Sequence, residues 1–139
     1  MQFNKLIPEL DVSNLEKSLH FYVDLLGSSI AYRREESKFI FLSLQGSQIM
    51  LQERNGNWET GVLEYPYGRG INFQIQVNSI SVMLDILSKD GYPLMKDPWE
   101  SWYRRDDVFI GQREFLVQDP DGYLLRFFEH LGVREQKPK

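Results

Sequence analysis

The sequence predicts an α+β fold made of two βαβββ modules, and three observations lead to this prediction. Strand and helix patterns follow one another in the same order in both halves of the chain. Corresponding features lie at a nearly constant offset, since Val77 follows Val12 by 65 residues and Gly91 follows Gly27 by 64. The 139 residues are 42% apolar, which suits one compact domain. Because either half alone buries its apolar sheet face poorly, the repeat favours paired modules over an α+β sandwich whose halves look alike by chance.

The first module is predicted over about residues 1–54. It opens with a strand, because apolar residues alternate over residues 3–10. Ser13 or Asn14 can cap the helix that follows, and Gly27 ends it, since glycine readily adopts the left-handed conformation at a helix C-terminus. Three strands separated by turn residues then complete the module, over residues 29–33, 38–44 and 48–53.

A linker over about residues 55–69, rich in Asn, Gly and Pro, leads to the second module over about residues 70–131. Its first strand alternates cleanly over residues 70–77, and Asn78 or Ser79 can cap the next helix. The later part carries an insertion relative to the first module. The remaining elements are strands near residues 93–96, 108–118 and 123–129, followed by a charged tail over residues 132–139.

Composition excludes several classes of function. Sixteen basic against 20 acidic residues give a formal net charge of -4, so a phosphate backbone is a poor partner and we expect no nucleic acid. The chain has no cysteine, which excludes disulfides, thiolate metal sites and cysteine nucleophiles. No apolar run approaches the roughly 20 residues that span a bilayer, and no signal peptide is visible. We therefore expect no membrane partner and a cytoplasmic location.

Alternation along the strands predicts one apolar and one mixed face for each sheet. In the strand from residue 70, Phe73 and Ile75 point one way while Asn72 and Gln74 point the other. The apolar face is expected to pack on the helices. The mixed face carries amides that a buried core would leave without partners, so it predicts a cleft for a small molecule. A solvated outer face with a few structural amides is the alternative.

Several stretches of the chain resemble one known superfamily. They are residues 8–15, the Ser-Leu-x-Phe-Tyr pattern at 18–22, Leu-Leu-Gly at 25–27, and residues 113–127, which contain Asp-Pro-Asp-Gly at 119–122. Together they resemble the glyoxalase/bleomycin-resistance/extradiol-dioxygenase superfamily, also called vicinal oxygen chelate proteins. The Arg-Glu-Phe before the Asp-Pro-Asp-Gly is most similar to the bleomycin-resistance branch. The resemblance implies curved mixed sheets with the helices on their outer face, and a homodimer with two clefts.

Catalytic members of this superfamily hold a divalent metal with His and Glu side chains. The resemblance implies that the corresponding positions here are Ile7, Met50, Asn72 and Arg126. None of these is a strong metal ligand, and a guanidinium repels a cation. We therefore expect no catalytic residue, no metal and no cofactor, and a binding protein rather than an enzyme. A metal-dependent glyoxalase, lyase or dioxygenase is the alternative.

The bleomycin-resistance branch implies a small-molecule ligand that is planar and cationic, such as a glycopeptide antibiotic, and hence a role in antibiotic resistance. Such a ligand requires aromatic platforms, acids and amides. The expected ligand-binding residues are Glu9, Phe39, Phe41, Met50, Gln52, Asn72, Gln74, Trp99, Trp102, Tyr103, Phe109, Glu114 and Arg126. Burial in a dimer interface is the alternative role for the aromatic residues, and an endogenous metabolite is the alternative ligand.

The segment before Arg113 departs from the pattern of that branch. Some drug-sequestering members have a tryptophan directly before Gly-Arg-Glu-Phe. Here the corresponding residue is Ile110, and Gln112 is an extra residue between Gly111 and Arg113. The stacking platform must therefore come from elsewhere in the chain, or the ligand is not bleomycin.

Overall fold

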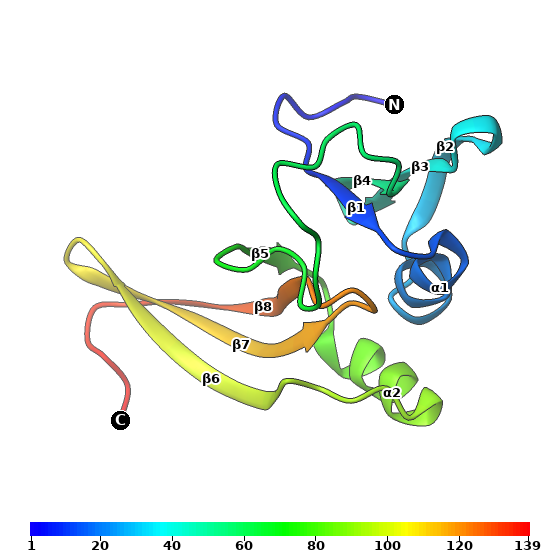
Figure 1. Cartoon of the computed structure of the whole chain (residues 1–139). Coiled ribbons are helices and arrows are strands. Elements are labelled where there is room, and N and C mark those ends of the chain that lie inside the picture. The colour runs from blue at the N-terminus through cyan, green and yellow to red at the C-terminus, as the bar shows by residue number, and fades with distance from the viewer. The chain divides into compact units, whose positions relative to one another are not determined.

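The computed structural model describes all of residues 1–139, which form two compact units (Figure 1). The first unit holds Met1–Arg69 together with Asp119–Gly122, and the second holds Gly70–Gln118 and Tyr123–Lys139. Each unit contains one four-stranded sheet with both parallel and antiparallel pairs, which confirms the predicted α+β fold of two βαβββ modules. None of the helices has the length and hydropathy that crossing a bilayer requires.

The sheet of the first unit has the strand order β1-β4-β3-β2. β1 pairs with β4 in parallel, and the two remaining pairs are antiparallel. The elements are β1 (Glu9–Val12), α1 (Leu15–Leu19), the π-helical segment η1 (His20–Leu25), β2 (Ser29–Arg34), the 3-10 turn η2 (Glu35–Ser37), β3 (Phe39–Leu44) and β4 (Ser47–Glu53). The predicted strands after the helix are thus confirmed to within one residue.

β1 begins later than the strand expected over residues 3–10, so that expectation is wrong at its start. The backbone N–H of Asn4 donates to the side-chain oxygen of Gln48 at 2.8 Å rather than to a strand carbonyl. Pro8 has no N–H to offer to a neighbouring strand. The alternation before Glu9 therefore does not reflect a buried face, and Leu6 is 86% exposed.

The first helix starts at one of the two predicted caps. The side chain of Asn14 accepts a hydrogen bond from the backbone N–H of Lys17 at 3.0 Å, which satisfies one of the free donors at the helix start. The helix continues as the π-helical segment η1. This segment ends shortly before Gly27, whose φ of 82° favours glycine. α1 packs against β4, and the fully buried side chains of Phe21 and Leu51 belong to the core of this unit.

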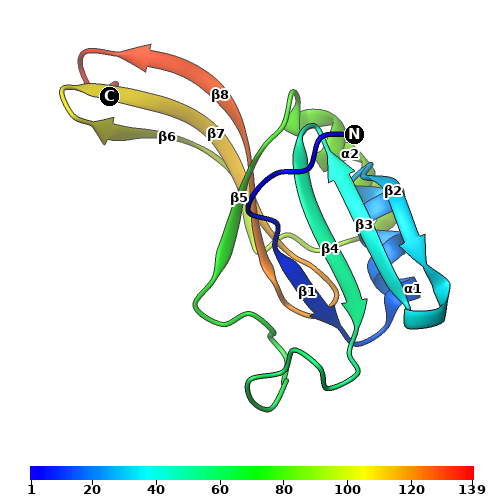
Figure 2. The same ribbon diagram turned by 90° about the horizontal axis from the view of Figure 1, so that it is seen from above.

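The second unit repeats the same arrangement with the strand order β5-β8-β7-β6. β5 and β8 are parallel, and the other pairs are antiparallel. Figure 2 shows β6, β7 and β8 running together past the end of β5. The elements are β5 (Asn72–Gln76), α2 (Ile80–Asp90), β6 (Lys96–Arg105), β7 (Val108–Gln118) and β8 (Leu124–Arg134).

The segment expected to be an insertion is a strand, and the short strand expected over residues 93–96 is wrong. β6 begins only at Lys96 and runs to Arg105, because β7 offers it backbone partners, with one irregularity between Lys96 and Trp99. Asp106, with a φ of 55°, makes the tight turn between them. β8 likewise continues to Arg134, so part of the predicted charged tail is paired strand.

The core of the second unit lies between one face of its sheet and α2. Phe115 and Phe127 are fully buried and stack with their ring centroids 5.6 Å apart. Ile80 and Leu87 of α2 are also buried, which confirms the predicted apolar face. Ser79 is the N-cap, but its side chain accepts no hydrogen bond from the helix, and the backbone N–H of Ile80 donates to the carboxylate of Glu129.

The Asp-Pro-Asp-Gly turn connects two strands of the second unit but belongs to the first unit. The hydroxyl of Tyr22 donates to Asp119 at 2.8 Å, and the backbone N–H of Ser13 donates to the Asp121 carboxylate at 3.0 Å. Gly122 lies so close to Pro66 that a Cβ would come within 2.5 Å of the proline. The turn therefore fixes the start of the first helix as well as reversing the chain.

Candidate functional site

The first unit carries five of the predicted ligand-binding residues on one face of its sheet, which we call the polar face of the first unit. Register places these side chains in two rows that cross all four strands. The rows are Glu9, Met50, Phe41 and Tyr32, and then Asp11, Gln52, Phe39 and Arg34. Paired residues of neighbouring strands point to the same side, so the predicted alternation is confirmed here. Tyr32 and Arg34 were missed because β2 was not assigned a face from the sequence, and Asp11 because the predicted first strand ended at residue 10.

The aromatic residues of this face form a closed cluster. Tyr32 stacks on Phe41 with the ring centroids 5.2 Å apart, and the Arg34 guanidinium lies 4.4 Å from the centroid of Phe39. Phe3 contacts Phe41 edge-on at 5.3 Å. Phe39 and Phe41 are therefore only 4% and 1% exposed, while Phe3 and Tyr32 remain accessible. Rings available to stack on a ligand are thus those of Phe3 and Tyr32 rather than the two predicted phenylalanines.

Glu9 and Asp11 bring two carboxylates to one edge of the polar face. Burial raises the pKa of Glu9, the charge of Asp11 raises it further, and Arg34 opposes the rise. Burial also raises the pKa of Asp11, Glu59 adds to that rise, and Arg54 opposes it. Two partly desolvated carboxylates of like charge attract a cation, because the cation removes their mutual repulsion.

The two amides of β4 serve the structure of the first unit. The side-chain amide of Gln52 is buried and donates to the backbone carbonyls of Ser37 and Glu53, which holds the turn between β2 and β3. Gln48 holds the N-terminal segment, since its Nε2 donates to the carbonyl of Gln2 at 2.8 Å. The side-chain N–H groups of Gln52 therefore donate to the backbone of its own chain rather than to a ligand.

The second unit carries its own polar face, with a buried ion pair at its centre. Glu114 is 0% exposed, and its two carboxylate oxygens accept from Arg126 Nη2 at 3.1 Å and from the Tyr103 hydroxyl at 2.8 Å. Arg126 also donates to the Asn72 side chain at 3.4 Å. A buried charge is tolerated only when it is paired and hydrogen-bonded, which this network achieves. Glu114, a predicted acid for a cationic ligand, is thus already neutralised by Arg126.

Gln74 and Gln112 form the second part of this polar face. Gln74 Nε2 donates to Gln112 Oε1 at 3.2 Å. The side-chain nitrogen of Gln112 is buried and has no hydrogen-bond partner. Gln112 was not among the predicted site residues, although the sequence marked it as an extra residue.

Of the four predicted aromatic residues of β6 and β7, Tyr103 and Trp99 share a face, and the other two do not lie on it. Trp99 pairs in register with Glu114 and therefore shares its polar face, but the Lys96 ammonium lies 3.8 Å from the centre of its ring. Trp102 pairs with Gly111 and Phe109 with Arg104, so strand alternation turns Trp102 and Phe109 to the opposite face. Trp102 lies directly over Gly111 there.

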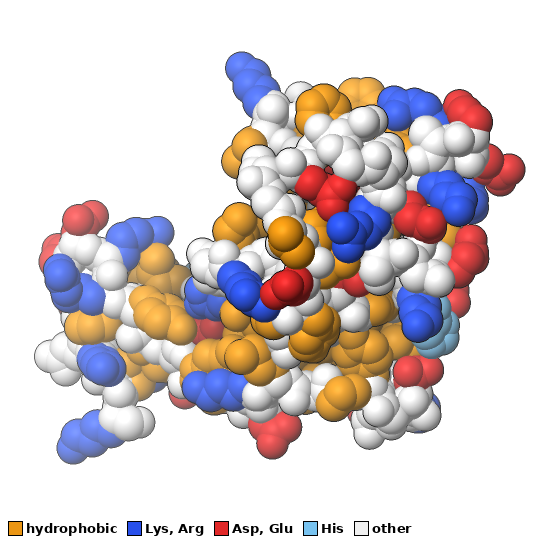
Figure 3. All heavy atoms as spheres, in the orientation of Figure 1, with side chains coloured by type: hydrophobic (Ala, Val, Ile, Leu, Met, Phe, Trp, Pro, Cys, Tyr) orange, Lys and Arg blue, Asp and Glu red, His pale blue; other side chains and the backbone are white.

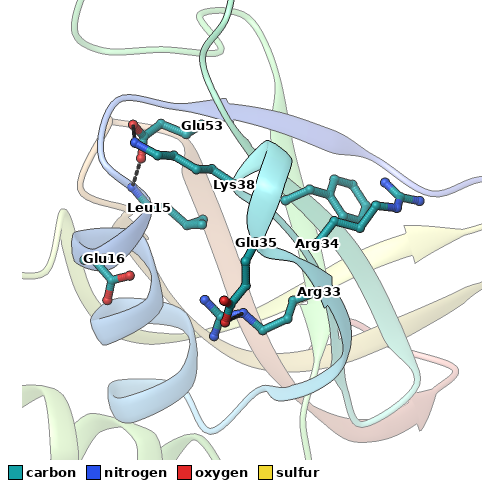
Figure 4. Close-up of a pocket in the computed structure, with 8 residues that line it drawn as sticks. Leu15, Glu16, Arg33, Arg34, Glu35, Lys38 and Glu53 are labelled. Atoms are coloured by element: carbon teal, nitrogen blue, oxygen red, sulfur yellow. Dashed lines mark hydrogen bonds and ion pairs between the residues drawn. The ribbon is translucent and has the colours of Figure 1, made fainter.

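The first unit also contains a cavity of about 400 Å³ beside the start of α1 (Figure 4). Glu53 accepts there from the backbone N–H of Leu15 at 3.1 Å and from Lys38 at 3.2 Å. These two hydrogen bonds, the Leu15 N–H foremost, hold the pKa of Glu53 below its usual range. The cavity is lined by Leu15, Glu16, Arg33, Arg34, Glu35, Lys38, Phe39 and Glu53. Phe39 is the one predicted ligand-binding residue in this set. Two ion pairs lie among these residues, Arg33 with Glu35 at 3.6 Å and Lys38 with Glu53 at 3.2 Å.

Charged side chains of both signs lie on the face of the molecule drawn in Figure 3. On the face drawn in Figure 3, Lys and Arg side chains alternate with Asp and Glu, and hydrophobic side chains lie between them. No large basic patch is visible on that face. This distribution agrees with the net charge of -4 and does not favour binding to a phosphate backbone.

The residues present do not fit a divalent metal. The positions at which the resemblance implies metal ligands hold Ile7, Met50, Asn72 and Arg126. Arg126 brings a fixed positive charge and is paired with Glu114. The structure contains no group of three or more His, Cys, Asp or Glu side chains placed to hold a metal ion. The two polar faces instead carry hydrogen-bonding groups, charges and aromatic rings.

The chain is similar to several known proteins. The model of the Glyoxalase/Bleomycin resistance protein/Dioxygenase superfamily matches residues 8–127. A probable lactoylglutathione lyase of Vibrio cholerae is 27% identical over 134 residues, which cover 89% of this chain and 91% of that protein. A bleomycin resistance protein of Geobacillus stearothermophilus is 28% identical over 138 residues, which cover 90% and 96%. The crystal structure of a glyoxalase/bleomycin resistance protein/dioxygenase from Alicyclobacillus acidocaldarius shares the fold, with a TM-score of 0.64, 20% identity, and coverage of 93% and 92%.

Proposed function

Because the chain belongs to the Glyoxalase/Bleomycin resistance protein/Dioxygenase superfamily, we propose that it is a binding protein that sequesters a small planar compound without transforming it. The compound carries a cationic group, as a bleomycin-like glycopeptide does. The similarity to bleomycin resistance proteins over almost the whole chain supports this choice of ligand class. An antibiotic-resistance role follows from the same proposal.

The ion pair between Arg126 and Glu114 is the observation that carries the proposal. Arg126 stands at a position where the resemblance implies a metal ligand, and its guanidinium has donors but no acceptor to offer a metal. Glu114, its buried partner, has both carboxylate oxygens occupied by Arg126 and Tyr103. A Lewis-acid centre needs converging anionic or imidazole donors, and this network offers a cation in their place. Binding without chemistry is the function that this donor set supports best.

The polar face of the first unit supports a ligand with a positive charge. Glu9 and Asp11 lie two residues apart on the same side of β1, and burial raises the pKa of both. Tyr32 and Phe3 present accessible rings on the same face. A flat cation gains from carboxylates and from aromatic rings together, by charge attraction and by stacking.

Calorimetric titration of the purified protein with metal-free and with copper-loaded bleomycin tests the proposal. We expect stoichiometric binding, and a compound that is recovered unchanged after incubation with the protein. Glu9→Gln is expected to weaken binding, whereas Glu64→Gln, the same charge change at an exposed position of the linker, leaves it unchanged. No heat at micromolar protein rejects bleomycin as the ligand. Lactoylglutathione lyase activity with added Ni²⁺ or Zn²⁺ rejects a purely binding role.

A homodimer is part of this proposal, with the family resemblance as its support. Light scattering during size-exclusion chromatography measures the molar mass in solution. We expect a mass of twice the 16.5 kDa chain. A mass of one chain at the concentrations used for calorimetry contradicts the dimer.

A further inference from the structure

We propose that the side-chain amide of Gln112 is a ligand-binding group, which donates a hydrogen bond from Nε2 to a carbonyl or carboxylate oxygen of the bound molecule. This inference rests on the proposed function, because it assigns a contact within the polar face of the second unit. It adds a residue that no resemblance implies. It also adds a requirement on the ligand, which must carry an accessible oxygen acceptor as well as its cationic group.

The environment of Gln112 leaves one strong donor without a partner. The residue is 7% exposed, so its amide is withdrawn from water. Its Oε1 accepts from Gln74 Nε2 at 3.2 Å, which fixes the orientation of the amide group. Its Nε2 has no acceptor within hydrogen-bond distance. A buried polar group without a partner destabilises a folded protein, so such a group in a native structure requires an explanation.

No neighbouring oxygen of the second unit lies within hydrogen-bond distance of the Gln112 nitrogen. Both carboxylate oxygens of Glu114 are engaged, by Arg126 and by Tyr103. The side-chain oxygen of Asn72 accepts from Arg126. The polar groups of this network are thus paired with one another, and the Gln112 nitrogen is the donor that has no partner among them. An acceptor from outside the chain completes the network.

The charges on this face favour an oxygen acceptor. Arg126 retains 27% of its side-chain exposure while it pairs with Glu114, so part of its guanidinium is accessible. Lys96 lies on the ring of Trp99, which shares the face with Glu114. Two cations and an amide donor around one buried carboxylate leave a surface that attracts negative or partly negative oxygen. Peptide carbonyls and carboxylates both provide such an oxygen.

A strand irregularity accompanies this residue. Gln112 pairs with His130, whereas the preceding Gly111 pairs with Gly132, so the partner strand has one unpaired residue at this point. A β-bulge redirects the side chains beside it and is common next to binding sites. The sequence marks the same position, because Gln112 is the extra residue relative to Gly-Arg-Glu-Phe.

Gln112→Met separates a ligand-binding role from a structural one, since methionine keeps the volume and removes the amide. Calorimetry with metal-free bleomycin is expected to show about tenfold weaker binding, the loss of one hydrogen bond to a buried donor. The melting temperature of the free variant is expected not to fall, because the unpaired donor is gone. Gln76→Met, an exposed amide on the same face, is the matched control and is expected to bind like the wild type.

Unchanged bleomycin affinity in Gln112→Met overturns this inference and leaves the proposed function intact. A lower melting temperature in that variant, or an equal loss of affinity in Gln76→Met, also overturns it, because either result assigns the effect to the fold or to the whole face.

A second measurement does not depend on bleomycin. The side-chain amide signals of Gln112 in the ¹H–¹⁵N spectrum of the wild type are followed during titration with N-methylacetamide and, separately, with acetate. Shifts of these signals, with the Gln76 signals unmoved, support an acceptor site for an amide carbonyl or a carboxylate according to the titrant. No shift with either titrant overturns the inference. If bleomycin gives no heat while these signals shift, the ligand class of the proposed function fails and the Gln112 site stands.

Discussion

Replacing Arg126 by methionine leaves the carboxylate of Glu114 in the interior of the second unit with one donor, the hydroxyl of Tyr103. Removing one partner of a fully buried ion pair destabilises a protein by about 3–5 kcal/mol, because the remaining charge is left unpaired. The side chain of Arg126 is 27% exposed, so water reaches part of the space that it vacates. The Tyr103 hydrogen bond of 2.8 Å also remains. We therefore expect Arg126→Met to lower the free energy of unfolding by about 2–3 kcal/mol at neutral pH.

Urea unfolding, followed by tryptophan fluorescence, measures this loss. Glu114→Gln alone is expected to cost about 1 kcal/mol, because a neutral amide replaces the buried charge and Arg126 regains contact with water. In the double variant the destabilisation is expected to be smaller than in Arg126→Met alone, since no unpaired charge remains. Two results refute the reasoning: a loss below about 0.5 kcal/mol in Arg126→Met, or strictly additive losses in the double variant.

Three further predictions concern groups outside this pair. Glu9→Gln raises the urea midpoint at pH 7, because a raised pKa means that the ionised carboxylate opposes folding. The difference in midpoint between variant and wild type disappears below about pH 4, where the carboxyl is protonated in the folded and the unfolded protein. Glu53→Gln lowers the urea midpoint at pH 7, because a carboxyl with a lowered pKa stabilises the fold in its ionised form. This contribution is complete above about pH 4.5 and is lost as the pH falls through the lowered pKa of Glu53. A difference in midpoint that does not change with pH contradicts this prediction. Gly111→Ala destabilises the second unit by about 1–3 kcal/mol, since the new methyl group would lie 2.5 Å from the ring of Trp102, and Trp102→Val in the same chain restores most of the loss.

The sequence predicted the fold well because its local signals agree with its long-range pattern. Asn14 caps the first helix, Gly91 ends the second with a φ of 76°, and strand alternation separates the buried Phe115 and Phe127 from the polar side chains. Each of these signals depends only on neighbouring residues and on burial of one face. The repeat of the pattern in both halves then specified two modules of the same kind.

The site was predicted only in part, because cross-strand register decides which side chains meet. Trp99 and Trp102 both lie in β6, three residues apart, so they point to opposite faces. Assigning their faces required the start of β6, and the sequence placed a strand earlier, over residues 93–96. Tyr32 was missed for a similar reason, since the register of β2 shifts between Ile30 and Tyr32.

Pairing between charged groups was also invisible in the sequence. Glu114 was expected to be an acid available to a cationic ligand, but the structure shows it already paired with Arg126. Burial of Gln112 could not be seen either, because a glutamine between glycine and arginine has no pattern that indicates withdrawal from water. Its position as an extra residue was the available signal.

Equilibrium dialysis against Ni²⁺, Zn²⁺ or Fe²⁺, followed by elemental analysis of the protein, most directly tests whether the polar faces bind a molecule without a catalytic metal. We expect far less than one ion per chain, with the same content in Asn72→Ala as in the wild type. One ion per chain that is lost in Asn72→Ala contradicts the account, because it assigns metal-binding to the network that we describe as an ion pair.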